Sequence, residues 1–253
     1  MPIVAAASVA CQNPGGAHQT ARASDEWTRT LPLGVDDELR ILNTNGSLDL
    51  EGVSSGTVEV RAERVAHATT DQAARELLTH INIRDTNDAG KVTVETERIG
   101  GVLIGVSFEV NYHVKAPAAA LIRTRTSDGP TTFTGTTGRV IASGVNGAII
   151  GRAVAGGIEA RTTNGQIDVE LLKVSDQVVD LRTVNGGIKL AVPLQANATL
   201  SATSVNGMID VTGLAFEKFG DEARRRIRGR INAGGSPIEL NAINGDIRVR
   251  ARE

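Results

Sequence analysis

Residues 138–169 read GRVIASGVNGAIIGRAVAGGIEARTTNGQIDV, and this stretch decides the fold. Glycines recur in it every nine residues, and Asn-Gly pairs occur at Asn146-Gly147 and Asn164-Gly165. Two and four residues after each pair come apolar or small residues, such as Ile167 and Val169. Alternate side chains therefore face the same way, as in a strand. The pattern is a turn followed by a short strand, and it repeats along the chain.

The same pair recurs outside this stretch. It is found at Asn45-Gly46, Asn185-Gly186, Asn206-Gly207 and Asn244-Gly245. Asn and Gly tolerate the positive φ that a sharp turn needs. An Asn-Gly pair can also close a two-residue antiparallel hairpin, which is the competing interpretation. The nine-residue interval favours coils of 18 to 21 residues, because the strand that follows one glycine also precedes the next Asn-Gly pair.

Stacked coils place equivalent strands side by side, about 4.8 Å apart, as in a parallel sheet. We therefore expect an all-β fold, a β-solenoid. Two expectations follow for equivalent positions. The isoleucines after the turns should form one internal column: Ile149, Ile167, Ile188, Ile209 and Ile247. The turn asparagines should form a ladder of side-chain amides, which would satisfy otherwise unpaired polar groups.

Composition narrows the functional classes. The chain has 253 residues, enough to bury a sizeable core, and 27 basic against 29 acidic residues give a net charge of −2. No polyanion partner is indicated globally. Only six residues are aromatic, which argues against single-stranded nucleic acid and against sugar binding by aromatic stacking. One cysteine excludes an internal disulfide and a multi-cysteine metal site.

Residues 1–26 resemble a clipped secretory signal followed by a polar tether. The first ten residues are small and apolar, and Ser8-Val9-Ala10-Cys11 is similar to a bacterial lipoprotein cleavage box. Cys11 would then carry the lipid, and the true start codon would lie upstream. Such boxes usually have Leu where Ser8 stands. The alternative is a disordered N-terminus with an incidental cysteine.

Residues 27–116 are expected to form an irregular first part of the solenoid. The repeat appears there once, around Asn45-Gly46, and Thr70 and Asp71 can cap a short amphipathic helix at residues 71–80. Residues 117–253 form the regular repeats. Two packed subdomains divided near Pro117 are the alternative to one continuous domain.

An insertion at residues 214–236 interrupts the beat between Gly207 and Gly245. It carries five arginines in seven residues, namely Arg224, Arg225, Arg226, Arg228 and Arg230. A flexible arm of this kind could bind an anionic partner. The alternative is a solvated arm whose charges keep a sheet edge from pairing with other chains.

A search for catalytic or metal-binding patterns finds none. The four histidines are scattered, and neither a phosphate-binding loop nor a nucleophile elbow is present. No cofactor is expected. A carbohydrate-active solenoid, lyase-like or hydrolase-like, is the enzymatic alternative. Its groove would be lined by Glu159, Asp168, Asp180, Lys189 and Asp210.

The ordered set of motifs resembles a known family. Trp27-Thr28-Arg29, the Asn45-Gly46 coil, the helix before Pro117 and the repeated Asn-Gly-x-Ile-x-Val units come in that order. Together they resemble the bacterial putative-adhesin family of β-strand-repeat envelope proteins. The resemblance implies a right-handed β-solenoid in the cell envelope, with no catalytic residues to carry over.

The expected function is accordingly a non-enzymatic scaffold or adhesin-like binding module of the bacterial cell envelope, periplasmic or at the surface. Its partner would be an envelope polymer, an anionic lipid surface or another protein, and not nucleic acid. Contact with a membrane is expected only through an N-terminal lipid anchor.

Overall fold

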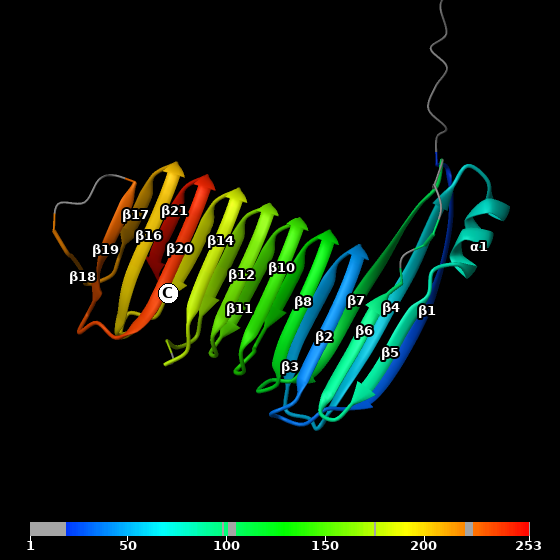
Figure 1. The fold of residues 1–253 in the computed structure, drawn as a ribbon, viewed down its shortest axis with the longest axis horizontal. Coiled ribbons are helices and arrows are strands. Elements are labelled where there is room, and N and C mark those ends of the chain that lie inside the picture. Colours follow the sequence, from blue (N-terminus) through cyan, green and yellow to red (C-terminus); the bar gives the residue numbers. More distant parts are fainter. Residues whose placement is uncertain (1–18, 98, 101–104, 175, 221–224, 253) are drawn as a thin grey trace, which may run out of the picture.

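The computed structural model describes residues 19–97, 99–100, 105–174, 176–220 and 225–252 (Figure 1). In these residues two long, mixed sheets enclose one main hydrophobic core. Alternate side chains of nearly every strand point into that core, while the others face solvent. The expectation of an all-β fold is confirmed, and the architecture is solenoid-like.

Sheet A has ten strands in the described part. In spatial order they are β1 (Ala21–Pro32), β4 (Thr57–Ala68), β7 (Ser107–Pro117), β3 (Leu48–Val53), β9 (Thr131–Thr134), β11 (Ile149–Val154), β13 (Ile167–Leu171), β15 (Ile188–Val192), β21 (Ile247–Ala251) and β17 (Ile209–Thr212).

Sheet B has eleven strands in the same residues. In spatial order they are β18 (Phe216–Lys218), β19 (Arg226–Ile231), β16 (Ala198–Asn206), β20 (Ser236–Asn244), β14 (Val179–Asn185), β12 (Ile158–Asn164), β10 (Val140–Asn146), β8 (Leu121–Asp128), β2 (Glu38–Asn45), β6 (Lys91–Thr96) and β5 (Ile83–Asp88).

Each Asn-Gly pair joins a strand of sheet B to a strand of sheet A. Strand β12, for example, ends at Asn164, and β13 begins at Ile167 after the turn. Equivalent strands of successive coils pair in parallel, with Ile158 beside Val179 and Ile167 beside Ile188. The parallel coil is therefore correct for this stretch, and the antiparallel hairpin is not.

The isoleucine column forms, but its order differs from the sequence. Ile149, Ile167 and Ile188 are neighbours in parallel register, and the next neighbour is Ile247, not Ile209. Ile209 pairs beyond Ile247 and is only partly buried. The coil β20–β21 is inserted between β14–β15 and β16–β17, so the last coil of the sequence is not the last coil of the stack.

Residues 214–236 were predicted to be an insertion, either a flexible arm for an anionic partner or an arm that protects a sheet edge. The flexible arm is wrong for the part described, and its pairing fits the edge-protecting alternative. Strand β19 pairs antiparallel with β16 over six residue pairs, and β18 pairs with β19. Ile227 and Ile231 of β19 are buried, so the segment continues the core. The segment covers the edge that β16 would otherwise expose and carries the chain back to β20. Arg224 lies outside the described residues.

The opposite end of the stack uses a similar arrangement. Coil β2–β3 lies between β6–β7 and β8–β9, so the chain again passes over one position and returns. Strands β1, β4 and β7 then pair antiparallel, and β5 pairs antiparallel with β6. Strand β1 already begins at Ala21. The tether expected up to residue 26 is therefore wrong from residue 21 onward.

Helix α1 (Asp71–Thr79) forms where the sequence predicts it, beside β1 and β4 (Figure 1). The side chain of Thr70 accepts a hydrogen bond from the backbone N–H of Ala73, and Asp71 places a carboxylate in the first turn. Ala74 and Leu77 face the strands and are buried. The apolar side of the helix thus closes the core at this end.

Gly165→Ala should destabilise the fold, because turns of adjacent coils touch. A Cβ atom at residue 165 would lie 2.0 Å from the carbonyl oxygen of Gly147. Overpacking of this kind costs about 3 kcal/mol, since backbone must move to relieve it. Denaturant unfolding measures the loss. The matched control is Gly56→Ala, where a Cβ meets no atom within 4 Å. Equal losses in the two variants would contradict close turn stacking.

Candidate functional site

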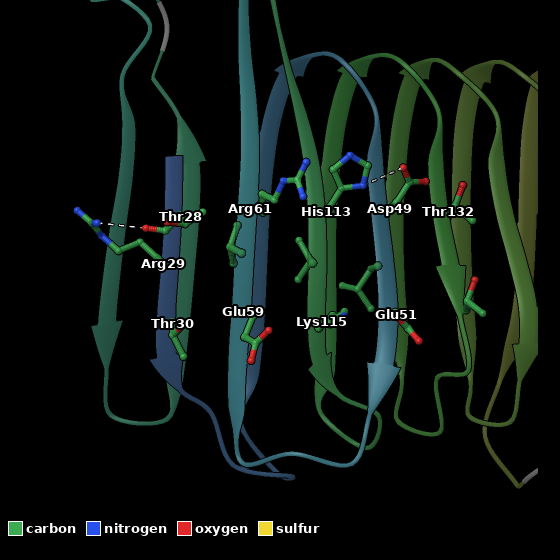
Figure 2. A pocket seen from close by; sticks show the side chains of 14 residues that line it. Thr28, Arg29, Thr30, Asp49, Glu51, Glu59, Arg61, His113, Lys115 and Thr132 are labelled. Carbon is green, nitrogen blue, oxygen red and sulfur yellow. Dashed lines mark hydrogen bonds and ion pairs between the residues drawn. The ribbon is translucent and has the colours of Figure 1, made fainter. Parts of the chain in front are cut away.

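A shallow trough lies on the outer face of sheet A, at the N-terminal end of the stack (Figure 2). Its volume is about 640 Å³, and it crosses β1, β4, β7, β3 and β9. Strand alternation places Leu50, Val60 and Val114 beneath it, in the core. The neighbours of these residues along each strand point outward, so the trough has a polar lining above an apolar floor.

The lining side chains form two rows across the strands. Arg61, His113 and Asp49 are cross-strand neighbours in the first row. The second row contains Glu59, Lys115 and Glu51 in the same order. Threonines flank the rows, namely Thr28, Thr30, Thr132 and Thr134. Opposite charges directly across adjacent strands stabilise a sheet, so the second row, with Lys115 beside Glu51, also has a structural reason. Glu59 also stands beside Lys115, so that row alternates in sign.

The two rows differ in how far their charges are already engaged. His113 Nδ1 lies 3.7 Å from Asp49 Oδ2, an ion pair when the histidine is protonated. Arg61 Nε lies 3.0 Å from a carboxylate oxygen of Glu26. Among the described residues, no hydrogen bond or ion pair engages the side chains of Lys115, Glu51 and Glu59. The second row is therefore free to bind a ligand.

Arg29 borders the trough, but its side chain contacts residues at the N-terminal end of the stack. Its Nε lies 3.4 Å from Asp85 on β5, which links the edge strands of the two sheets. Its guanidinium also sits 5.2 Å from the ring centre of Trp27, within the range of a cation–π contact. Figure 2 shows the side chain directed away from Lys115 and Glu51.

The trough offers charged and hydroxyl groups for binding. Glu51 and Glu59 are exposed, and Lys115 stands between them in the sheet. The geometry favours the recognition of a ligand that carries charged and hydroxyl groups.

The five residues of the expected carbohydrate groove do not share a groove. Glu159 and Asp180 lie side by side on the outer face of sheet B, whereas Asp168, Lys189 and Asp210 lie on sheet A. Asp180 is nearly buried and accepts hydrogen bonds from Arg161 at 3.1 Å and Arg182 at 2.7 Å. The Asp180 hydrogen bond raises the pKa of Arg182.

Arginines likewise engage the carboxylates next to Asp180 and on the other sheet. Glu159 is bound by Arg139, and Asp168 by Arg152 at 3.0 Å. The expected groove is thus wrong, because successive strand residues alternate between faces and the two sheets face opposite ways.

The turn asparagines form a chain of side-chain hydrogen bonds. Each Nδ2 donates to the Oδ1 of the next coil. The order is Asn206 to Asn244 at 2.9 Å, Asn244 to Asn185 at 2.7 Å, Asn185 to Asn164 at 2.8 Å, Asn164 to Asn146 at 2.8 Å, and Asn146 to Asp128 at 2.7 Å. Asn45 stands apart, since its Nδ2 donates to the carbonyl of Phe108 at 2.6 Å.

The glycines of the same pairs carry the backbone part of the stack. The N–H of Gly147 donates to Asn164 O, and that of Gly165 to Asn185 O, each at 2.9 Å. Gly46, Gly186 and Gly245 donate in the same way to Asp128, Asn244 and Asn206. Gly207 ends the stack, where a Cβ would lie 2.2 Å from the carbonyl oxygen of Gly245.

A second ladder, inside the turns, was missed by sequence reasoning. The hydroxyls of Thr162, Thr183 and Ser204 donate to the carbonyl oxygens of turn glycines in neighbouring coils, at 2.9 to 3.0 Å. Each hydroxyl residue stands two positions before an Asn of an Asn-Gly pair. That spacing was the available signal. These hydroxyl groups give hydrogen-bond donors to carbonyl groups that the close stacking removes from water.

Coil β2–β3 replaces this ladder with a buried polar cluster. Asn43 Nδ2 donates to Val110 O at 2.9 Å, and Asn43 Oδ1 accepts from the Thr96 hydroxyl at 3.1 Å. The Thr96 hydroxyl also lies 2.7 Å from the hydroxyl of Tyr112. Burial raises the pKa of Tyr112 to about 12. The cluster ties β2, β6 and β7 together across the core.

The expected arginine site is divided by the structure. Arg225, Arg226, Arg228 and Arg230 are exposed at the C-terminal end of the stack, while Arg224 lies outside the described residues. Arg230 donates two hydrogen bonds to Glu217. The proposed lipidation residue, Cys11, also lies outside the described residues.

Neither a metal site nor a membrane-spanning helix is present in the described residues. No group of three or more His, Cys, Asp and Glu side chains there could hold a metal ion. The helix in that part of the chain is too short and polar to cross a membrane.

Comparison with known proteins places the chain in a family. Residues 35–250 match the sequence model of Toastrack DUF4097. The chain belongs to the Toastrack DUF4097 family. This match confirms the resemblance to a putative-adhesin family of unknown function. No functionally curated protein matches the chain.

Solved structures resemble this Toastrack protein in fold. A putative cell adhesion protein from Clostridium sporogenes aligns with a TM-score of 0.53 and 11% identity, covering 91% of this chain and 100% of that one. A putative adhesin from Bacteroides fragilis gives a TM-score of 0.28 and 9% identity, over 90% and 97% of the two chains. At 11% identity the likeness to the Clostridium protein concerns the fold alone.

Asn185→Ala should cost more stability than Asn206→Ala. Asn185 both donates and accepts within the ladder, whereas Asn206 stands at its end and only donates. At about 1 kcal/mol for each hydrogen bond, the losses should be about 2 and 1 kcal/mol. Urea unfolding of both variants measures them. Negligible losses at both positions would show that the ladder contributes nothing to stability.

Tyr112 should make the fold sensitive to high pH. Its pKa in the folded protein, about 12, is above the ordinary tyrosine value of 10.0, so the stabilising contribution is full below pH 10 and falls as pH rises towards 12. The loss approaches about 1.4 kcal/mol per pH unit, because the unfolded chain loses its phenolic proton first. Tyr112→Phe should remove this component. Equal slopes for both proteins between pH 10 and 12 would contradict it.

Proposed function

We propose that this Toastrack protein is a non-enzymatic scaffold of the bacterial cell envelope that binds its partner as an adhesin does. The observation that carries the proposal is the free second row of the trough. Glu59, Lys115 and Glu51 stand exposed and unpaired on a rigid sheet, above a packed apolar floor. A rigid sheet that presents polar groups favours binding, because little backbone order remains to be imposed.

The fold likeness supports the same class of function. The protein from Clostridium sporogenes that shares the fold is named for cell adhesion, and an adhesive protein acts at the cell surface or in the envelope. We infer for this chain a lipid anchor at Cys11 and a right-handed winding of 18–21-residue coils. Right-handed crossovers between parallel strands of one sheet are by far the most frequent.

The trough is best suited to an envelope polymer that carries peptide groups. The Lys115 ammonium would pair with a carboxylate of the ligand, and Glu51 and Glu59 with amino groups. The flanking threonines would bond amide or hydroxyl groups. A purely anionic surface fits less well, because Glu51 and Glu59 outnumber Lys115 in the free row.

Co-sedimentation with insoluble cell-wall polymer tests this proposal. Lys115→Gln combined with Glu51→Gln leaves the net charge unchanged and should weaken binding by roughly tenfold, since charge-assisted contacts are lost. The matched control is Lys189→Gln with Asp210→Asn, on the same face of sheet A but further along the stack. Binding that is absent in the parent protein, or equally weakened in both variants, would overturn the proposal.

The carbohydrate-active alternative is tested with the same polymer. Two exposed glutamates on either side of Lys115 are the feature that keeps it under consideration. We expect the parent protein to release no reducing ends from the polymer over prolonged incubation. Release that disappears in a Glu51→Gln variant would replace the scaffold with a hydrolase.

A further inference from the structure

The C-terminal end of the stack carries the one exposed aromatic ring of the protein. All six aromatic residues lie in the described part. Tyr112, Phe133 and Phe108 are buried, and Trp27 and Phe216 pack against the core. Phe219 is 47% exposed. A single exposed apolar side chain is common on protein surfaces, so Phe219 matters here only through the groups beside it.

Phe219 lies beside Arg228 on the outer face of sheet B. Its backbone N–H donates to Arg228 O at 2.9 Å, which continues the pairing of β18 with β19. Glu217, two residues earlier, points outward and bonds Arg230. Side chains two apart on a strand share a face, so Phe219 points to the same side as Arg228.

Arg226 and Arg228 project from β19 as a free pair. Both are exposed, and they alternate with Ile227, which is buried, and Gly229. No ion pair or hydrogen bond engages either guanidinium among the described residues. The backbone of β19 and its buried isoleucines already cover the edge of β16. The two arginines are therefore not needed for that structural role.

Hydroxyl groups lie on the other side of the arginines. Ser201 is the cross-strand neighbour of Arg228, and Thr203 that of Arg226. Thr203 also borders a shallow, largely apolar hollow of about 440 Å³ on sheet B, which Val205 and Ile243 line further along. Arg161 and Arg182 also line this hollow, and none of its lining residues is acidic. Glu239, the cross-strand neighbour of Ser201, lies 3.5 Å from Arg182, which offsets its charge.

We propose that Phe219, Arg226 and Arg228, with Ser201 and Thr203, bind an acidic polysaccharide. The planar guanidinium groups suit carboxylates, which accept two parallel hydrogen bonds. The phenyl ring offers an apolar face to a sugar ring, and the hydroxyls offer partners for sugar hydroxyls. This site lies on the other sheet and at the other end of the stack from the trough, so it stands or falls independently (Figure 1).

Binding of polygalacturonate, a carboxylated polysaccharide, tests the proposal with the full chain. Arg226→Gln with Arg228→Gln should weaken binding by roughly tenfold or more, and Phe219→Ala should weaken it several-fold. The control is Arg248→Gln with Arg250→Gln, which removes the same charge from the outer face of β21 and should leave binding unchanged. Thermal unfolding shows whether each variant is folded. If the double arginine variant is unstable, Phe219→Ala tests the proposal alone, because Phe219 is exposed.

Three further probes decide between ligand classes. Dextran, which is uncharged, should not bind. Polyphosphate that binds as tightly as polygalacturonate, with no effect of Phe219→Ala, would overturn the polysaccharide in favour of any polyanion. Stronger binding to vesicles rich in anionic lipid would overturn it in favour of a membrane surface. Absence of polygalacturonate binding by the parent protein would also overturn the proposal.

Discussion

Successive turns of the stack approach so closely that a Cβ atom on Gly147 or Gly165 would lie 2.0 Å from the carbonyl oxygen of the glycine one coil before. This approach removes turn carbonyls from water, and each needs a partner. The threonine hydroxyls of the inner ladder bond turn carbonyls, while the exposed asparagine side chains bond one another from coil to coil. Glycine, asparagine and threonine thus recur together at the turns. The flat sheet faces that carry the trough depend on this close approach.

The repeat could be predicted because it is local. A turn glycine, an apolar residue two positions later and a second four positions later fix a strand and its inward face, whatever the neighbouring coil is. The order of coils could not be predicted in the same way. Asn244-Gly245 is identical to the other pairs, and nothing in it shows that β20–β21 lies beside β14–β15. Which neighbour a coil accepts depends on how the ends of the stack are covered.

The candidate sites follow the same division. Arginines at alternate positions near residues 226–230 were visible in the sequence, although their place on a paired strand was not. The trough was not visible, since Glu51 and Glu59 are far from Lys115 in the chain and all three look like ordinary solvated strand residues. Only the pairing of β3 with β7 and of β7 with β4 brings them into one row. The hydroxyl residues of the inner ladder stand at a fixed spacing from the turn asparagines, but that spacing alone does not show which carbonyl groups they bond.

The two ends of the stack are covered in the same way. At each end the chain passes over a position, forms antiparallel strands, and returns to fill the gap. An uncovered parallel coil at the end of a stack would expose an edge that can pair with other chains. Here coil β16–β17 and the strands that cover it come before β20–β21 in the sequence, but β20–β21 lies between them and the rest of the stack. The end coil therefore cannot detach without disturbing β20–β21. The end strands can then carry unpaired charges, because their backbones are secured by neighbours. Lys115 in the trough and Arg228 on β19 both lie near an end of the stack. Each combines a backbone that is paired on a strand with a side chain that a ligand can reach. The trough and the arginine surface lie on opposite sheets and at opposite ends of the stack, so a ligand at one does not obstruct the other.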